Sequence, residues 1–183
     1  MNRLQVWQKN IITVDLLYKL NSTNFHNITQ LKNILLKSTV NTIILEPKDI
    51  IFGLVILQLL SNQKAKVLKT HKSVAAFKTR KSIPISSKVT MRSKNLYNYM
   101  DLLVCIVLPK LSDFNSLKVK SIVNSKKSLS MGVSNLSMFP QLTKELEHLP
   151  KNIGLTITFN INSVKSNLIL LLLLSEFQVP VIL

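Results

Sequence analysis

Hydrophobic residues recur at helical spacing at the start of the chain. They are Leu4, Trp7, Ile11, Ile12, Val14, Leu17 and Leu20. Apolar positions three or four residues apart line one face of an α-helix. The pattern therefore predicts an amphipathic N-terminal helix over residues 3–20, which the polar stretch 21–27 brings to an end.

Extended segments are predicted where β-branched residues gather. Residues 34–45 contain several Thr, Val and Ile positions, which favours a strand. Residues 66–70 and 88–92 have the composition of two further strands that pair with each other. The polar segment between them predicts a long basic loop over residues 71–87.

Three more helices are indicated further along the chain. Asp49 is a suitable N-cap for a helix that continues to Leu60. The apolar spacing over residues 93–107 predicts a second helix, and Pro109 is expected to stop it. Residues 163–177 predict a third.

Two of these helices contain runs that are almost wholly apolar, at residues 50–60 and 168–174. A helix that spans a membrane needs roughly 20 consecutive apolar residues. Both runs are shorter than that and end at polar residues, so we interpret them as buried helices of a core. No membrane insertion is expected.

The remaining segments complete the predicted fold. Residues 128–133 and 153–161 alternate as strands do, whereas residues 112–127 are irregular. Strands and helices intermix without regular alternation, which favours the α+β class: an antiparallel sheet with helices packed on one face and a long basic loop. A length of 183 residues fits a single domain over residues 1–183. The other face of the sheet is then free to bind.

The charge of the chain indicates a class of function. The net charge is +16, yet 46% of the residues are hydrophobic, so the chain is expected to fold. From Ile50 to Met100 there are ten Lys and Arg residues and no Asp or Glu. Such a field of one sign repels itself unless an anion neutralises it. A nucleic-acid backbone is the expected anion.

Signatures of catalysis are poor. Three glycines do not supply a phosphate-binding loop, and eight acidic residues leave little material for acid and base pairs or for a metal site. No cofactor is expected. The single cysteine, Cys105, lies in an apolar run and is interpreted as a buried, inert thiol. The N-terminal segment has the pattern of neither a secretory signal nor a transit peptide, so the protein is expected to act where it is made.

The segment Leu68 to Arg92 is the candidate binding element. It interleaves basic residues with Phe77, small residues and hydroxyls. This mixture suits a loop that approaches phosphate while an aromatic ring packs on a sugar or base. The alternative is a solvated charged loop with Phe77 in the core, but the missing acidic residues favour binding.

A family resemblance adds to this interpretation. The string Lys72 to Arg80 (KSVAAFKTR), followed by Pro84-Ile85 and by Lys88 to Arg92 (KVTMR), resembles the signature of the ribosomal large-subunit protein five family. Further matches follow in order over nearly the whole chain, at Leu108-Pro109-Lys110 with Asp113-Phe114, Ser130 to Val133 with Phe139-Pro140, and Gly154 to Thr158; Asn62-Gln63-Lys64 matches upstream. That family attaches 5S ribosomal RNA to the large subunit.

The resemblance implies two sets of binding residues. The sheet face and its neighbouring loops would hold 5S rRNA, together with large-subunit rRNA, through Lys37, Gln63, Lys64, Lys69, Phe77, Lys88, Thr90 and Arg92. The loop would reach the elbow of peptidyl-site tRNA through Lys72, Ser73, Lys78, Thr79, Arg80 and Lys81. The family also implies a contact with a small-subunit ribosomal protein across the subunit interface.

Departures from the family pattern suggest which genome encodes the protein. Lys37 stands where the family usually has Asn in its first RNA-facing strand, so a hydrogen bond is replaced by a charge contact. Lost arginines and gained Lys and Asn resemble a fast-evolving copy encoded by an organelle, and we expect a mitochondrial matrix ribosome. The leading hypothesis is a non-enzymatic structural constituent of the mitochondrial large subunit.

Two other classes of function remain open on the sequence. One is a basic RNA-binding protein outside the ribosome, such as an rRNA-maturation protein. The other is a peripheral membrane protein that uses its lysines on anionic lipid and its Leu-rich C-terminal part as a wedge. The second accounts for the charge but not for the ordered motifs.

Overall fold

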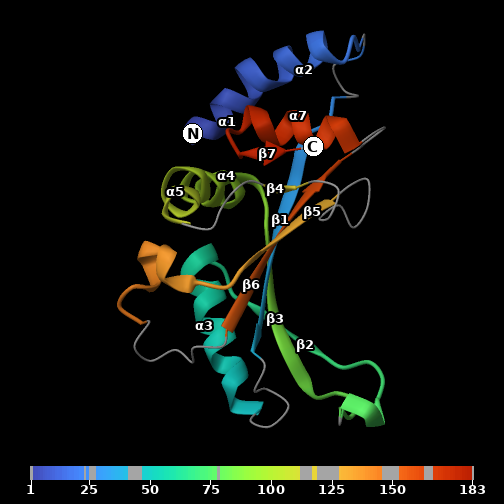
Figure 1. Ribbon diagram of the computed structural model, residues 1–183, viewed down its shortest axis with the longest axis vertical. Coiled ribbons are helices and arrows are strands. Elements are labelled where there is room, and N and C mark those ends of the chain that lie inside the picture. Colours follow the sequence, from blue (N-terminus) through green and yellow to red (C-terminus); the bar gives the residue numbers. More distant parts are fainter. Residues whose placement is uncertain are drawn as a thin grey trace. The chain divides into compact units, whose positions relative to one another are not determined.

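The computed structural model describes residues 2–22, 24, 28–40, 47–77, 79–111, 117–118, 128–145, 153–162 and 167–182. Its main element is a five-stranded antiparallel sheet in the order β2-β3-β1-β6-β5 (Figure 1). The strands are β1 (Leu31–Val40), β2 (Lys66–Lys69), β3 (Pro84–Met91), β5 (Ser128–Val133) and β6 (Ile153–Ile161). Two short strands, β4 (Leu117–Lys118) and β7 (Val181–Ile182), pair in parallel as a second sheet. The predicted α+β class is confirmed.

The chain divides into two compact units. Unit 1 comprises residues 1–34, 91–131 and 158–183, and unit 2 comprises residues 35–90 and 132–157. The single domain expected over residues 1–183 stays a prediction.

In unit 1, the N-terminal helix is confirmed, with a π-helical segment in its middle. It runs through α1 (Arg3–Trp7), η1 (Gln8–Ile12) and α2 (Thr13–Lys19). The predicted apolar face was partly wrong, because Trp7, Ile11 and Val14 are exposed whereas Gln8 is buried. The buried Gln8 Oε1 accepts a hydrogen bond from the Tyr97 hydroxyl at 2.5 Å, which satisfies the amide oxygen inside the unit.

The second long helix of unit 1 extends past its predicted end. It comprises α4 (Ser93–Leu102), the π-helical η6 (Leu103–Val107) and α5 (Leu108–Lys110). Pro109 was expected to stop this helix, but it lies inside α5. Proline is tolerated in the first turn of a helical segment, and the wider π-helical turn before it makes Pro109 such a position.

The last helix of unit 1, α7 (Asn167–Glu176), confirms the predicted Leu-rich core helix. Leu170, Leu173 and Leu174 are fully buried. Its predicted start, residues 163–166, lies outside the described residues. None of the helices in the described ranges is both long and apolar enough to cross a membrane.

In unit 2, helix α3 (Ile50–Ser61) packs tightly on the sheet. The short 3-10 turn η4 (Pro47–Asp49) precedes it, and Asn62 ends it in the left-handed conformation with φ 53°. A Cβ atom added at Gly53 would lie 2.9 Å from Ser87 Oγ and 3.4 Å from Ser38 Oγ. Because Gly53 has no side chain, α3 lies closer to β1 and β3 than it could with a larger residue at this position.

The observed bounds of the strands agree only in part with the predicted ones. β5 and β6 have the bounds that their alternation predicts. β1 begins at Leu31 rather than at residue 34, and residues 41–45 of the predicted strand lie outside the described residues. Of the predicted irregular segment 112–127, only β4 is described.

The predicted loop over residues 71–87 was too long, because β3 begins at Pro84. Lys66 pairs with Lys88, so the antiparallel partners of the rest of β2 must precede Lys88 in the chain. Proline is compatible with the first position of a strand, where no ladder hydrogen bond is required from it. The connection between the strands therefore covers residues 70–83, and Lys78 within it lies outside the described residues.

Candidate nucleic-acid interface

One face of the sheet is lined with polar side chains. In β6 the odd-numbered residues from Ile153 to Ile161 are buried, whereas Gly154, Thr156, Thr158 and Asn160 are partly exposed. Alternate residues of a strand point to opposite faces. The side of β6 that does not carry the apolar core residues is therefore neutral and rich in hydrogen-bonding groups.

In unit 2, this open face is cationic. Ser38 and Ser87 both point at Gly53 of α3, so their chain neighbours Lys37 and Lys88 point to the opposite face. Lys66 is the direct partner of Lys88 and shares that face with it. Lys37 and Lys66 are exposed, and Lys88 is half-buried. The open face of unit 2 thus presents three lysines.

In unit 1, the open face holds its polar groups in pairs. Asn160 Nδ2 donates to Asn33 Oδ1 at 2.7 Å and links β6 to β1. The hydroxyls of Ser130 and Thr158 lie 3.1 Å apart and link β5 to β6. These residues were missed as site candidates, although the alternation over residues 153–161 already separates polar from apolar positions.

The other predicted 5S rRNA contacts belong to unit 2, except Arg92, which follows β3 in unit 1. Thr90 is half-buried on the same side of β3 as Lys88. Gln63 follows α3 and is half-buried, and its backbone N–H donates to Ser61 Oγ at 3.2 Å. Lys64, Lys69 and Arg92 are exposed. The side chain of Phe77, which belongs to the short turn η5 (Ala75–Phe77), lies outside the described residues.

The connection between β2 and β3 is held narrow by a backbone bridge. Val74 N–H donates to Thr79 O at 3.0 Å, and Thr79 N–H returns a bond to Val74 O at 3.2 Å. At its base, Thr70 Oγ1 donates to the Arg80 carbonyl at 2.5 Å. The bridge makes Val74 to Thr79 the tip of a hairpin-like arm, with Thr79 half-buried and Lys78 outside the described residues.

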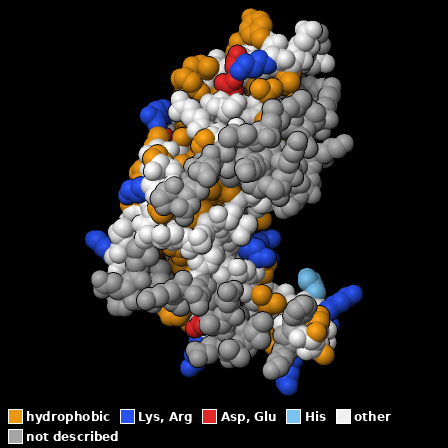
Figure 2. Space-filling view, viewed as in Figure 1, with side chains coloured by type: hydrophobic (Ala, Val, Ile, Leu, Met, Phe, Trp, Pro, Cys, Tyr) orange, Lys and Arg blue, Asp and Glu red, His pale blue; other side chains and the backbone are white. Residues whose placement is uncertain are grey.

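Basic side chains surround this tip. Lys72, Ser73, Arg80 and Lys81 are all exposed. Figure 2 shows Lys and Arg side chains that project from this part of the chain, at the lower right of the view, without a described acidic side chain beside them. The geometry provides an exposed cationic projection rather than a buried loop.

Three ion pairs are found among the described residues. In the part of the chain that the structure describes, Arg3 pairs with Asp101, and Lys19 pairs with Asp15 and Glu176. Lys19 Nζ donates hydrogen bonds to the carboxylates of Asp15 and Glu176, and these bonds raise the pKa of Lys19 to about 12. All of these pairs lie in unit 1, and none includes a predicted RNA contact.

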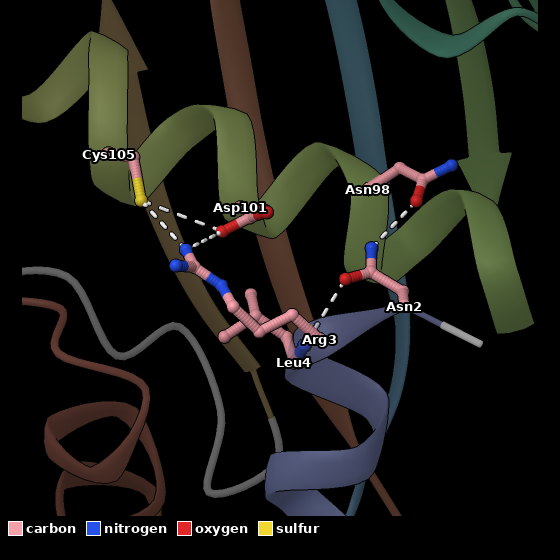
Figure 3. A network of polar contacts seen from close by, with 6 residues as sticks. All are labelled: Asn2, Arg3, Leu4, Asn98, Asp101 and Cys105. Carbon is pink, nitrogen blue, oxygen red and sulfur yellow. Dashed lines mark hydrogen bonds and ion pairs between the residues drawn. The ribbon is translucent and has the colours of Figure 1, made fainter.

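The buried thiol expected at Cys105 was wrong, because Cys105 is exposed. It lies one turn after Asp101 on the side of the helix that meets Arg3, where the guanidinium contacts Asp101 Oδ1 at 2.5 Å and Cys105 Sγ at 3.3 Å (Figure 3). Leu103 and Val107, two positions away on either side, are fully buried instead. Within the described ranges, no three His, Cys, Asp or Glu side chains form a group suited to a metal.

Comparison with known proteins identifies the family. Residues 84–181 match the model of the C-terminus of the ribosomal L5 protein family. The large ribosomal subunit protein uL5m of Reclinomonas americana is 34% identical over 180 residues, which cover 98% of each chain. The uL5 proteins of Buchnera aphidicola subsp. Cinara cedri and Nitrosomonas europaea are 32% and 29% identical, also over 98% of each chain. The predicted resemblance is thereby confirmed, and the chain belongs to the ribosomal L5 family, whose members are structural rather than enzymatic components of the ribosome.

Proposed function

We propose that the chain is a structural constituent of a mitochondrial large ribosomal subunit, where it binds 5S rRNA with its sheet and peptidyl-site tRNA with its β2–β3 connection. The observation that supports this most directly is the open face of unit 2, where Lys37, Lys66 and Lys88 stand together without an acidic partner among the described residues. Lysines that replace condensed counterions on phosphate supply affinity for RNA.

Two kinds of side chain suggest different roles in 5S rRNA binding. In unit 2, the lysines of the open face neutralise phosphates together with the exposed Lys64 and Lys69, and the exposed Arg92 of unit 1 adds a further cation. Gln63 and Thr90 supply neutral groups for sugars or base edges. Such polar groups read the 2′-hydroxyls and the unpaired bases that distinguish RNA. Large-subunit rRNA would meet the same basic surface.

The arm between β2 and β3 suits a contact with the backbone of a folded RNA. Lys72, Arg80 and Lys81 are exposed, Ser73 and Thr79 add hydroxyls, and Lys78 and Phe77 belong to the proposal by their places in the sequence. An exposed arm can extend from the sheet while the sheet itself remains bound. This supports separate contacts for tRNA and 5S rRNA.

The mitochondrial matrix is proposed on two grounds. A protein named uL5m is similar over 98% of both chains. The abundance of Lys, Asn and Ile fits an AT-rich genome, as organelle genomes often are. Encoding in the organelle and a contact with a small-subunit ribosomal protein belong to the same proposal.

Binding of the full-length chain to transcribed 5S rRNA, measured over a range of salt concentrations, tests the sheet. For Lys37→Ala with Lys88→Ala, we expect the slope of log K against log salt to become shallower by about 0.7 to 0.9 for each lysine. The matched control is Lys94→Ala with Lys144→Ala, which removes two exposed lysines outside the sheet. Equal changes in the slope for both pairs would refute the proposed sheet contact.

A further inference from the structure

We propose that the outer side of the N-terminal helix docks an amphipathic helix of a neighbouring protein. Four large side chains form this surface, which we call the outer stripe: Trp7, Ile11, Val14 and Tyr18. They are 40%, 44%, 41% and 81% exposed. Figure 2 shows hydrophobic side chains gathered at the top of the view, where Figure 1 places α1 and α2.

The outer stripe is separate from the core side of the same helix. Gln8, Ile12, Thr13 and Leu16 are buried and hold the helix to unit 1. The segment is therefore apolar on two sides, and only one side is used by the fold. An amphipathic helix needs a single apolar side to pack on a core. The second apolar side is therefore explained by a contact with another molecule.

The helix that carries the stripe is fixed at both ends. At its start, Arg3 forms an ion pair with Asp101, and Asn2 Nδ2 donates to Asn98 Oδ1 at 2.6 Å (Figure 3). Asp101 and Asn98 both belong to α4. At its end, Lys19 forms an ion pair with Glu176 of α7. A rigid helix loses little conformational freedom when a partner binds. These contacts preorganise the stripe.

The spacing of the stripe fits a partner helix. Its members are separated by four, three and four residues, the spacing of a seam that packs along another helix. The seam extends about 16 Å along the axis. Beside Trp7 lies a cavity of about 150 Å³, lined by Arg3, Leu4, Trp7, Glu176, Phe177 and Gln178. A side chain of the partner would fill this cavity and anchor the contact.

Charge decides the class of partner. Residues 2–22 contain three basic side chains, Arg3, Lys9 and Lys19. Arg3 and Lys19 are engaged by carboxylates of unit 1. Lys9 is two positions from both Trp7 and Ile11, so it does not share their side of the helix. RNA and anionic lipid both require free cations, whereas an uncharged apolar stripe matches the apolar side of a protein helix.

Photocrosslinking in assembled large subunits tests the proposal. The full-length chain carries p-benzoylphenylalanine in place of Ile11 or Tyr18, with Lys94 replaced in the control because it is exposed on a different helix. We expect both stripe positions to crosslink to one protein, at a peptide with apolar residues at helical spacing. Crosslinks to rRNA, to lipid or to a second copy of the chain, or no crosslink at all, would overturn it.

A second variant tests whether the stripe is required. Ile11→Asp with Val14→Asp places two charges on the seam while leaving the core side intact, and a thermal melt of the free chain checks that it folds. We expect at least a tenfold loss of the crosslink from Tyr18, with unchanged 5S rRNA binding. A folded variant that keeps the full yield would contradict the docking surface. Because 5S rRNA binding is measured separately, a failure of the proposed function is told apart from a failure here.

Discussion

At the scale of single residues, Gly53 shows how the helix and the sheet of unit 2 constrain one another. It is the fourth of the 12 residues of α3, inside the helix, where glycine is otherwise unfavourable. Its missing side chain leaves room for the hydroxyls of Ser38 and Ser87, both buried and without a hydrogen-bond partner among the described residues. The same two serines place Lys37 and Lys88 on the opposite face. The close approach therefore bears on the site as well as on stability.

Gly53→Ala tests this contact. Alanine normally stabilises a helix interior by about 1 kcal/mol relative to glycine. Here its Cβ meets Ser87 Oγ, and overpacking of this kind costs about 1 to 3 kcal/mol. We expect the free energy of unfolding, measured in urea, to fall by about 1 kcal/mol. In a Ser87→Ala background the sign should reverse, and the same loss in both backgrounds would contradict the steric explanation.

The solvent exposure of single side chains could be predicted in strands, where inward and outward positions alternate. It could not be predicted where a helix changes from α-helical to π-helical turns. Lys88 follows the buried Ser87, so its place on the open face follows from its strand. Cys105 and Ile11 lie in π-helical turns, whose side chains are rotated away from the regular spacing. Their exposure was therefore not predicted from apolar neighbours.

At the scale of elements, the antiparallel register of β2 and β3 sets where the arm begins. Lys69 pairs with Pro84, after a register shift between Leu68 and Lys69. The sequence predicted both strands and a connection between them. It did not predict the start of β3, because Pro84 resembles a loop residue until its partner strand is known. Long-range pairing decides such boundaries, and local composition does not contain it.

Removal of the four basic side chains of the arm separates its role from that of the sheet. For the variant Lys72→Ala, Lys78→Ala, Arg80→Ala and Lys81→Ala, we expect tRNA occupancy of the peptidyl site to fall severalfold, because each lost cation weakens phosphate binding. Binding of 5S rRNA should stay within twofold of the unchanged protein. Both are measured on reconstituted particles by filter binding and sedimentation. A parallel loss of both RNAs would refute the proposed division between arm and sheet.

At the scale of the whole molecule, charge and motif order carried most of the functional prediction. The family followed from motifs in register along the chain, from Asn62 to Thr158, and the α+β class followed from the mixed order of elements. The outer stripe was not foreseen, because a sequence pattern does not tell which of two apolar sides of one helix packs inward. That choice depends on what the rest of the chain places beside the helix.

The net charge of +16 makes association with the large subunit depend on salt. We expect the chain to sediment with purified large subunits at low salt. It should resist a moderate salt wash, because hydrogen bonds and shape add to the charge contacts. Variants that lack Lys37 and Lys88 should dissociate at a lower salt concentration, whereas those that lack Lys94 and Lys144 should not.

A maturation protein would be absent from mature subunits at every salt concentration, and a peripheral membrane protein would collect with membranes. Either result, read by immunoblot across the gradient, would contradict a ribosomal role.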